Sequence, residues 1–476
     1  MPESPFKTPV SWSIDKGEIW TVYGANGSGK SLLAEVIAGR YALQEGQIVY
    51  HFIDEMKQVT CSSERMFLPR DFIKIVHFNG VHSLAGFKEV YYQQRFNQSE
   101  SDDIPFVSDL FRHEELSSVL ELIDIRKLLN RRLNHLSSGE LRKLLIAKAL
   151  EENPRMLIFD NPFIGLDVES RGQLNDVFKK LSDNGMQLLF LVPSQKDIPD
   201  VTTHILILDD CQVMWKGKME SSFPEIVRKH SLEKLRIDWA YLSGLSGNKT
   251  SDYSAVVDME DIEIAYGDIV INRDINWKIQ KGEKWALLGP NGSGKSTLLS
   301  YIFADNPQAY AKKLYLFDRK RGSGESIWEI KKHIGFTSSE MHLYYRQHVS
   351  CLSVVSSGFF DSVGLYRKCT EEQLSIARYL FKVFGMEDLM ERPFLKVSSG
   401  EQRIILFARA LIKNPDLLIL DEPFHGLDKE HKEFCAGIIE SYCSQPDKSL
   451  IYVTHRQEEI PACVQHKICL KAYEKR

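Results

Sequence analysis

GPNGSGKST, residues 289–297, follows the apolar segment GEKWALLG at 282–289, and together they decide the fold. The spacing GxxxxGK[ST] after such a segment predicts a phosphate-binding loop. Its glycines let backbone N–H groups wrap the phosphates, and the helix that follows adds its positive dipole end. Lys295 is then expected to reach the β- and γ-phosphates of a nucleotide, and Ser296 to bind Mg²⁺. The stretch therefore predicts an α/β domain that binds a nucleoside triphosphate.

The phosphate-binding loop motif occurs twice in the sequence. GANGSGKSL at 24–32 repeats it in the first half of the chain. Three further pairs of segments recur in the same order at a nearly constant offset: LSSGE (136–140) and VSSGE (397–401), FDNPFIGLD (159–167) and LDEPFHGLD (420–428), and LLFLVPS (188–194) and SLIYVTH (449–455). Four motifs in one order indicate a duplicated domain. Because strands alternate with helical patterns in each copy, we expect two α/β domains with mostly parallel sheets.

The boundary between the copies falls in a small, polar, turn-forming stretch, LSGLSGNKTSDYS. We place the first domain at residues 1–235, a short linker at 236–254 and the second domain at 255–476. The linker contains no long charged helical arm.

The amino-acid composition is that of a globular protein and argues against several other classes. A hydrophobic content of 43% and a net charge of −5 over 476 residues are typical of a globular protein with no general affinity for nucleic acid. The eight cysteines show neither a disulfide framework nor metal-site spacing. No apolar run is long enough for a transmembrane helix, and no signal peptide is evident. We expect a cytoplasmic protein that reaches any membrane only through a partner.

Each copy has an apolar strand that ends in Asp, at Asp160 and at Asp421. Such an Asp lies beside the phosphate-binding loop and holds Mg²⁺. The next residue differs between the copies, since it is Asn161 in the first and Glu422 in the second. A carboxylate can polarise the attacking water, whereas an amide cannot accept its proton. The second site alone is therefore predicted to carry a general base.

The two SSGE segments come before amphipathic helices and, with the motifs above, resemble the signature of the ATP-binding cassette (ABC) superfamily. The resemblance covers almost the whole chain. It implies a tandem-cassette ATPase, in which each cassette has a RecA-like, mostly parallel sheet core with an antiparallel β subdomain and a helical subdomain. It also implies that the two cassettes pair within the chain, so that each ATP contacts the signature of the opposite cassette.

The resemblance implies roles for individual residues. The catalytic group comprises Glu422, His455 and Lys295, and Mg²⁺ is held by Ser296 and Asp421 in one site and by Ser31 and Asp160 in the other. The ATP-binding residues are Gly24, Ala25, Asn26, Gly27, Ser28, Gly29, Lys30, Ser31 and Leu32; Gly289, Pro290, Asn291, Gly292, Ser293, Gly294, Lys295, Ser296 and Thr297; the signature residues Ser138, Gly139, Ser399 and Gly400; and the adenine-stacking Tyr266.

The first site departs from the family pattern in three places. Counting back from Gly24 by the distance that separates Tyr266 from Gly289 reaches Met1, so the first cassette is expected to be shortened and to lack that strand and its aromatic residue. Asn161 replaces the glutamate, and the alignment of LLFLVPS with SLIYVTH puts Ser194 opposite His455. We expect the first site to bind ATP and retain it, while the second site turns over.

One departure affects the second cassette. IGFTSSE at 334–340 places Ser339 where the family has a glutamine that contacts Mg²⁺ and couples transporters to their membrane subunit. In the first cassette, IVHFNGVHSL is too diverged to assign an equivalent.

Residues 317–346 and 359–366 resemble tandem-cassette ATP-binding proteins of the molybdenum-transport and photorepair type. This implies an ATPase that energises or regulates transport, of molybdate by resemblance, at the inner face of the plasma membrane through a permease. The alternative is a non-transport ATPase acting on the ribosome or nucleic acid, like the ABC-F proteins. The short linker speaks against the alternative, and Ser339 weakens the importer interpretation. A non-hydrolysing scaffold is a third possibility.

Overall fold

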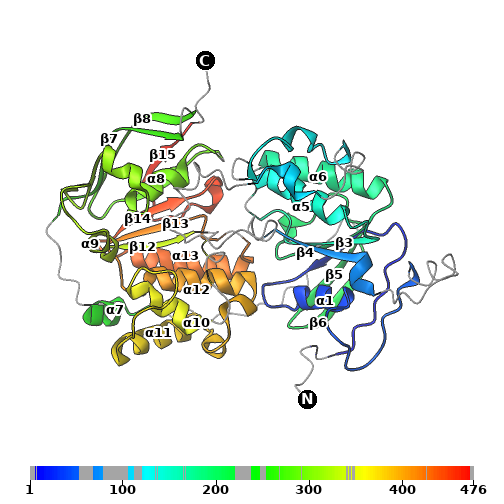
Figure 1. Ribbon diagram of the computed structural model, residues 1–476. Coiled ribbons are helices and arrows are strands. Elements are labelled where there is room, and N and C mark those ends of the chain that lie inside the picture. Colours follow the sequence, from blue (N-terminus) through cyan, green and yellow to red (C-terminus); the bar gives the residue numbers. More distant parts are fainter. Residues whose placement is uncertain are drawn as a thin grey trace. The chain divides into compact units, whose positions relative to one another are not determined.

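The computed structural model describes residues 6, 8–52, 68–78, 105–111, 121–133, 136, 138–164, 166, 168–219, 237–246, 253–266, 269–290, 292–338, 341, 345, 349–424 and 426–471. These residues divide into two compact units (Figure 1). Unit 1 comprises the described residues up to 219 together with Gly426–Asp428, and unit 2 comprises the others. Each unit is described by itself.

Unit 1 is built on one six-stranded sheet with the strand order β2-β3-β4-β1-β5-β6. All neighbours pair in parallel except β5 and β6, which are antiparallel. The strands are β1 (Trp20–Tyr23), β2 (Ile73–His77), β3 (Met156–Asp160), β4 (Gln187–Val192), β5 (His204–Asp209) and β6 (Gln212–Lys218). The central strands β3 and β4 are apolar and buried except for Asp160 at the end of β3 and Gln187 at the start of β4, as expected for parallel strands that are buried on both faces.

The helices described in unit 1 are α1 (Lys30–Ile37), α3 (Pro69–Phe72), α5 (Ser138–Leu150) and α6 (Val168–Asp183). Aromatic packing fixes α6 on the sheet, because the ring centroid of Phe178 lies 4.8 Å from those of Phe159 on β3 and Phe190 on β4. Helix α1 begins directly after the first phosphate-binding loop, and α5 begins at the first signature segment.

Unit 2 repeats this parallel sheet with the strand order β12-β13-β14-β9-β15. The strands are β9 (Lys284–Leu288), β12 (Ile334–Ser338), β13 (Leu417–Asp421), β14 (Ser449–Val453) and β15 (His466–Cys469). The order matches that of β2, β3, β4, β1 and β5, with the strand before the phosphate-binding loop in the fourth place of both sheets. The duplication predicted from the sequence is thus a duplication of topology.

A second, antiparallel sheet belongs to unit 2, with the order β11-β10-β7-β8. Its strands are β7 (Ala255–Tyr266), β8 (Ile269–Gln280), β10 (Lys313–Leu316) and β11 (Arg319–Lys320). In unit 1, the described residues 8–19 form no strand ahead of β1. Trp12 nevertheless packs edge-on against Trp20, as Trp277 of β8 packs against Trp285. The aromatic contact is thus present in both units, although the strand that carries it is found only in unit 2 among the described residues.

The helices of the second cassette are α8 (Lys295–Ile302), α9 (Ile327–Lys332), α10 (Cys351–Ser356), α11 (Glu371–Val383), α12 (Ser399–Leu411) and α13 (Lys429–Cys443). The signature segment caps α12. Ser398 Oγ accepts a hydrogen bond from the backbone N–H of Glu401, and the Ser398 N–H donates to the Glu401 carboxylate. This reciprocal capping box satisfies two N–H groups and fixes where the helix begins.

The residues expected to form a plain linker include a short helix, α7 (Trp239–Ser246). Its Trp239 indole N–H donates to Ser441 Oγ on α13 at 2.9 Å, and the Tyr241 hydroxyl lies 3.0 Å from Ser375 Oγ on α11. The Trp239 ring also meets Tyr442 edge-on. Small, polar and turn-forming residues suggested a short linker, and within it the aromatic side chains attach this helix to unit 2.

Candidate nucleotide-binding sites

Both phosphate-binding loops require glycine for steric reasons. Gly29 and Gly294, which immediately precede α1 and α8, have φ angles of 94° and 91°. A Cβ on Gly24 would lie 2.1 Å from the carbonyl oxygen of Leu208, which no side chain can accommodate. The glycines therefore set the path of each loop between its strand and its helix, as the sequence motif predicts.

The lysine of each loop turns its ammonium group back into the loop. Lys30 Nζ donates to the carbonyl oxygens of Gly24 and Ala25 at 2.8 and 2.7 Å, and Lys295 Nζ makes the equivalent contacts in the second loop at 2.7 and 2.9 Å. Burial lowers the pKa of Lys30 to about 8, although the nearby Asp160 carboxylate favours the charged form. An ammonium held in this position is suited to phosphate oxygens.

A hydroxyl and a carboxylate meet beside each loop. Ser31 Oγ donates to Asp160 Oδ2 at 3.1 Å, and Ser296 Oγ donates to Asp421 Oδ2 at 3.3 Å. These are the hard oxygen ligands that Mg²⁺ prefers. Within the described residues no group of three or more His, Cys, Asp or Glu side chains is placed to hold a metal ion. The pairs therefore fit an Mg²⁺ ion that takes its remaining ligands from a nucleotide and water.

The carboxylate of Glu422, the predicted general base of the second site, contacts the imidazole of His455. His455 Nδ1 lies 3.0 Å from Glu422 Oε1, and the two side chains are only 8% and 13% exposed. Arg456 Nε donates to His455 Nε2 at 3.3 Å. With Nε2 accepting from Arg456, Nδ1 is the ring nitrogen that can donate to the Glu422 carboxylate. The carboxylate is thus oriented at the carboxyl end of β13.

The first site has the same backbone at this position but different chemistry. Asn161 has φ 52° and donates its N–H to the Leu191 carbonyl at 2.9 Å, while Glu422 has φ 49° and donates to Val453 at 3.0 Å. The left-handed backbone is therefore preserved, and only the side chain has changed. Asn tolerates this conformation better than most residues.

Strand register corrects the alignment that paired Ser194 with His455. The sequence alignment places Leu191 opposite Tyr452. In the sheets, however, Asp160 pairs with Leu191, and its counterpart Asp421 pairs with Val453, one residue further on. β4 is therefore shifted by one residue relative to the sequence alignment. The pairing of β4 with β1 and of β14 with β9 shows the same shift. Pro193 is consequently the counterpart of His455, and Ser194 that of Arg456. Sequence alignment missed this because the two apolar strands match almost equally well in either register.

The remaining predicted residues take the following places. Ala25, Asn26, Gly27, Ser28, Pro290, Gly292 and Ser293 lie in the loops, and Leu32 and Thr297 lie in the first turns of α1 and α8. Ser138 and Gly139 begin α5, Ser399 and Gly400 begin α12, and Tyr266 ends β7. The side chains of Ser138 and Tyr266 are not described, and Asn291, Asp167 and Ser339 lie outside the described residues.

One residue beside the first site was missed by the sequence analysis. His77 ends β2 next to Asp160, with its Nδ1 3.7 Å from Asp160 Oδ2. It lies within IVHFNGVHSL, the segment that could not be assigned from the sequence. An ionisable residue at the end of an apolar strand was the available signal, but only the pairing of β2 with β3 shows which site it adjoins.

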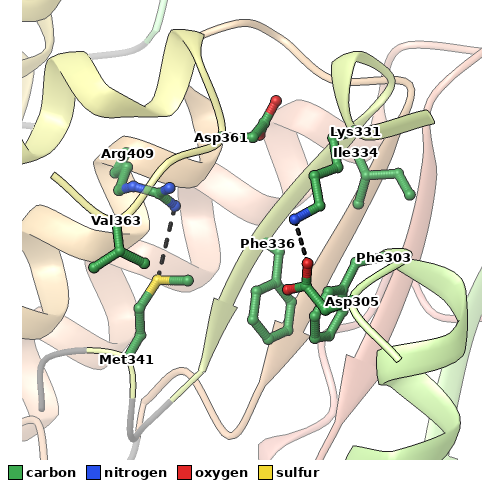
Figure 2. A pocket seen from close by; sticks show the side chains of 9 residues that line it. All are labelled: Phe303, Asp305, Lys331, Ile334, Phe336, Met341, Asp361, Val363 and Arg409. Atoms are coloured by element: carbon green, nitrogen blue, oxygen red, sulfur yellow. Dashed lines mark hydrogen bonds and ion pairs between the residues drawn. The ribbon is translucent and has the colours of Figure 1, made fainter. Parts of the chain in front are cut away.

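A cavity of about 40 Å³ in unit 2 lies away from the phosphate-binding loop (Figure 2). Its lining residues come from the segment after α8, from α9, β12 and α12 and from the other connecting segments: Phe303, Asp305, Lys331, Ile334, Phe336, Met341, Asp361, Val363 and Arg409. Figure 2 shows Lys331 turned toward Asp305, with which it forms an ion pair, and Arg409 turned toward the Met341 sulfur at 3.7 Å. None of the residues that line this cavity belongs to the predicted nucleotide site, so the cavity adds nothing to that site.

Family comparisons agree with this geometry. The model of the family described as ABC transporter matches residues 8–164 and 272–425, once in each half of the chain. The chain belongs to the ABC transporter family. It is 33% identical over 468 residues to the ABC transporter ATP-binding protein ModF of Escherichia coli, covering 96% of this chain and 92% of ModF. An uncharacterized ABC transporter ATP-binding protein of Schizosaccharomyces pombe is 27% identical, with 97% and 94% covered.

Solved structures support the tandem ABC fold. One chain of the ribosome-bound archaeal Pelota and ABCE1 assembly superposes with a TM-score of 0.55 at 17% identity, covering 96% of this chain and 72% of that one. This likeness concerns the fold alone. Among the residues described for this ABC protein, no helix has the length and apolar character needed to cross a bilayer.

Proposed function

We propose that this chain is a Mg²⁺-dependent ATPase with two unequal sites, in which the second site hydrolyses ATP and the first binds and retains it. The observation that carries the proposal is the contact between Glu422 and His455, which unit 1 replaces with Asn161 and Pro193. ABC proteins as a family bind ATP and generally hydrolyse it.

At the second site, Lys295 would bind the β- and γ-phosphates, and Ser296 and Asp421 would hold Mg²⁺. The ion neutralises charge that develops on the phosphate oxygens. Glu422 would accept a proton from water as the water oxygen attacks the γ-phosphorus, and the bond to the ADP oxygen breaks. His455 would keep the carboxylate oriented during this step. ATP and water would thus give ADP and phosphate.

At the first site, Lys30, Ser31 and Asp160 would provide the same contacts to phosphate and a divalent metal ion. The amide of Asn161 cannot accept the proton of the attacking water, and Pro193 offers no imidazole. ATP would therefore bind there and persist. The ATP at the first site would then stay bound while the ATP at the second site is hydrolysed.

The family resemblance adds contacts that rest on the sequence. By this part of the proposal, ATP of the second site contacts Ser138 and Gly139, and ATP of the first site contacts Ser399 and Gly400. Tyr266 would stack on adenine in the second site.

The test compares two matched substitutions in the full chain. Glu422→Gln should lower steady-state ATPase activity by about 10²- to 10⁴-fold, the usual effect of removing a general base. Asn161→Ala should leave the rate nearly unchanged. Filter binding with labelled ATP should show nucleotide on both variants, which confirms that they are folded. Equal losses from the two substitutions would contradict the proposal of unequal sites.

The proposal also extends to the cellular role of the protein. The similarity to ModF supports a link to a membrane transport process through a permease, with molybdate as the transported oxyanion by resemblance alone. A tagged Glu422→Gln form, purified with ATP from cells of the source organism, should recover a membrane permease from the detergent-solubilised membrane fraction. Recovery of ribosomes or nucleic acid without a permease would instead support the non-transport alternative.

A further inference from the structure

His77 stands between two carboxylates at the end of β2. Its Nδ1 is 3.7 Å from Asp160 Oδ2, and its Nε2 is 3.9 Å from Glu35 Oε1 on α1. Asp160 in turn accepts the hydrogen bond from Ser31 Oγ at 3.1 Å. The imidazole is 41% exposed, so an ion can reach it from solvent. A nitrogen donor thus adjoins the two oxygen ligands of the first site.

The second site has no such nitrogen at the equivalent position. β2 pairs with β3 as β12 pairs with β13, and this register makes Ser338 the counterpart of His77 beside Asp421. The counterpart of Glu35 on the loop helix is Ser300, which is fully buried and donates to a carbonyl of its own helix. The Glu35 carboxylate and the His77 imidazole are therefore found in unit 1 and replaced by serine at the equivalent positions of unit 2.

We propose that His77 Nδ1 is a ligand of the metal ion that accompanies ATP at the first site, together with Ser31 Oγ and Asp160 Oδ2. Two atoms that each bind one ion at about 2.1 Å lie between about 3 and 4 Å apart, so the 3.7 Å separation of Nδ1 from Oδ2 suits a shared ion. The inference rests on the proposed binding of ATP at this site.

Glu35 lies near the other nitrogen of the ring, with its Oε1 3.9 Å from Nε2, which is longer than a hydrogen bond. Arg40 holds this carboxylate through an ion pair at 3.1 Å. Glu35 is therefore a neighbouring charge, and the proposed ligand is His77 alone.

The imidazole changes which metal the site favours. Mg²⁺ binds almost only oxygen ligands, whereas Mn²⁺ and the later divalent ions also accept imidazole nitrogen. The first site should therefore prefer Mn²⁺ or a later transition ion over Mg²⁺, while the second site, whose candidate ligands among the described residues are the oxygens of Ser296 and Asp421, should remain a Mg²⁺ site. The two sites would then differ in metal as well as in hydrolysis.

Pulsed electron paramagnetic resonance of bound Mn²⁺ tests this directly, because it detects a ¹⁴N nucleus in the ligand shell. The full chain carrying Lys295→Ala, loaded with ATP and Mn²⁺, should show a directly bound ¹⁴N at the first site. His77→Ala in that background should lose the nitrogen signal and weaken Mn²⁺ binding by about tenfold or more, with a smaller change for Mg²⁺. The matched chain carrying Lys30→Ala, loaded at the second site, should show no such nitrogen.

A fluorescent ATP analogue, titrated into the same samples, separates the two ways in which the test can fail. If nucleotide and Mn²⁺ bind at the first site but the spectrum shows no ¹⁴N that depends on His77, the metal-ligand inference is wrong and the proposed function stands. If the Lys295→Ala chain binds no nucleotide, both the proposed first site and this inference are overturned.

Discussion

His455 Nδ1 and Glu422 Oε1 lie 3.0 Å apart because β13 and β14 are adjacent parallel strands that end at the same edge of the sheet. The glutamate directly follows β13, and the histidine lies two residues beyond β14. Unit 1 keeps both strands and the left-handed backbone at Asn161 but has neither side chain. The difference between the sites is therefore chemical and rests on a scaffold that both units share.

Loss of the imidazole should impair the chemistry of the second site more than its binding. We expect His455→Ala to lower kcat at least about tenfold while the KM for ATP changes little, since the carboxylate of Glu422 loses the group that orients it. Steady-state kinetics measures both constants. Arg456→Ala should lower kcat by a smaller factor, because Arg456 donates to the far nitrogen of the ring and acts on Glu422 only through His455. A rise in KM with unchanged kcat would show that His455 serves only binding.

The first site should gain hydrolysis only when both missing groups are supplied. We expect Asn161→Glu alone to add little activity, because its carboxylate would have no imidazole partner. The double variant N161E/P193H should raise the rate of the first site by about tenfold or more. The measurement uses Lys295→Ala chains, so that the second site is silent. If Asn161→Glu alone restores the full rate, the histidine is dispensable.

The buried lysine of the first loop should couple ATP binding to proton uptake. Burial lowers the pKa of Lys30 to about 8, below its value of about 10.4 in an unfolded chain. Phosphate oxygens favour the charged ammonium and raise this pKa, so ATP binding at pH 8 should take up about half a proton, and at pH 6 almost none. Calorimetric titrations of the Lys295→Ala chain in buffers of different ionisation enthalpy measure this number. Lys30→Arg in the same background is the control, because a guanidinium is charged throughout this pH range and should take up no proton when ATP binds.

The same pKa shift predicts how stability depends on pH. Between about pH 8 and pH 10.4 the unfolded chain binds more protons at Lys30 than the folded chain does, so this group's contribution to the free energy of unfolding rises with pH across that window. Below pH 8 both states are protonated, and the buried charge opposes folding by a constant amount. Urea unfolding measures the free energy of unfolding of the wild type and of Lys30→Met at several pH values. The wild-type value should rise relative to the Lys30→Met value as the pH increases across this window. A difference that does not change with pH would contradict the shift.

Helix α7 should contribute to the stability of unit 2. Trp239→Phe keeps the aromatic contact with Tyr442 but removes the donor to Ser441 Oγ, and we expect a loss of about 1 kcal/mol in the free energy of unfolding. Urea unfolding followed by circular dichroism measures it. Ser441→Ala should cost a similar amount, and the double variant less than the sum. Strictly additive losses would show that the two side chains do not interact.

The sequence was sufficient for the features that lie within one short segment. Each phosphate-binding loop, the Asp that follows each strand, and the change from Glu422 to Asn161 are local patterns of residues, and the structure places each loop Ser beside its Asp. The order of the motifs also predicted the repeated topology, because parallel sheets with short connections leave few alternatives. Helix α7 was missed, since its aromatic side chains are stabilised by partners distant in the chain.

Strand pairing decided what the sequence left open. Apolar strands carry little information about register, so the sequence paired Ser194 with His455, and only the pairing of β4 with β3 and β1 puts Pro193 there. The same holds for His77, which adjoins Asp160 solely because β2 is the neighbour of β3. The sequence by itself determined two cassettes with the phosphate-binding-loop motif and the difference between Asn161 and Glu422, through local patterns of residues. The tertiary structure decided which further side chains meet them, because those contacts depend on hydrogen bonds between strands far apart in the chain.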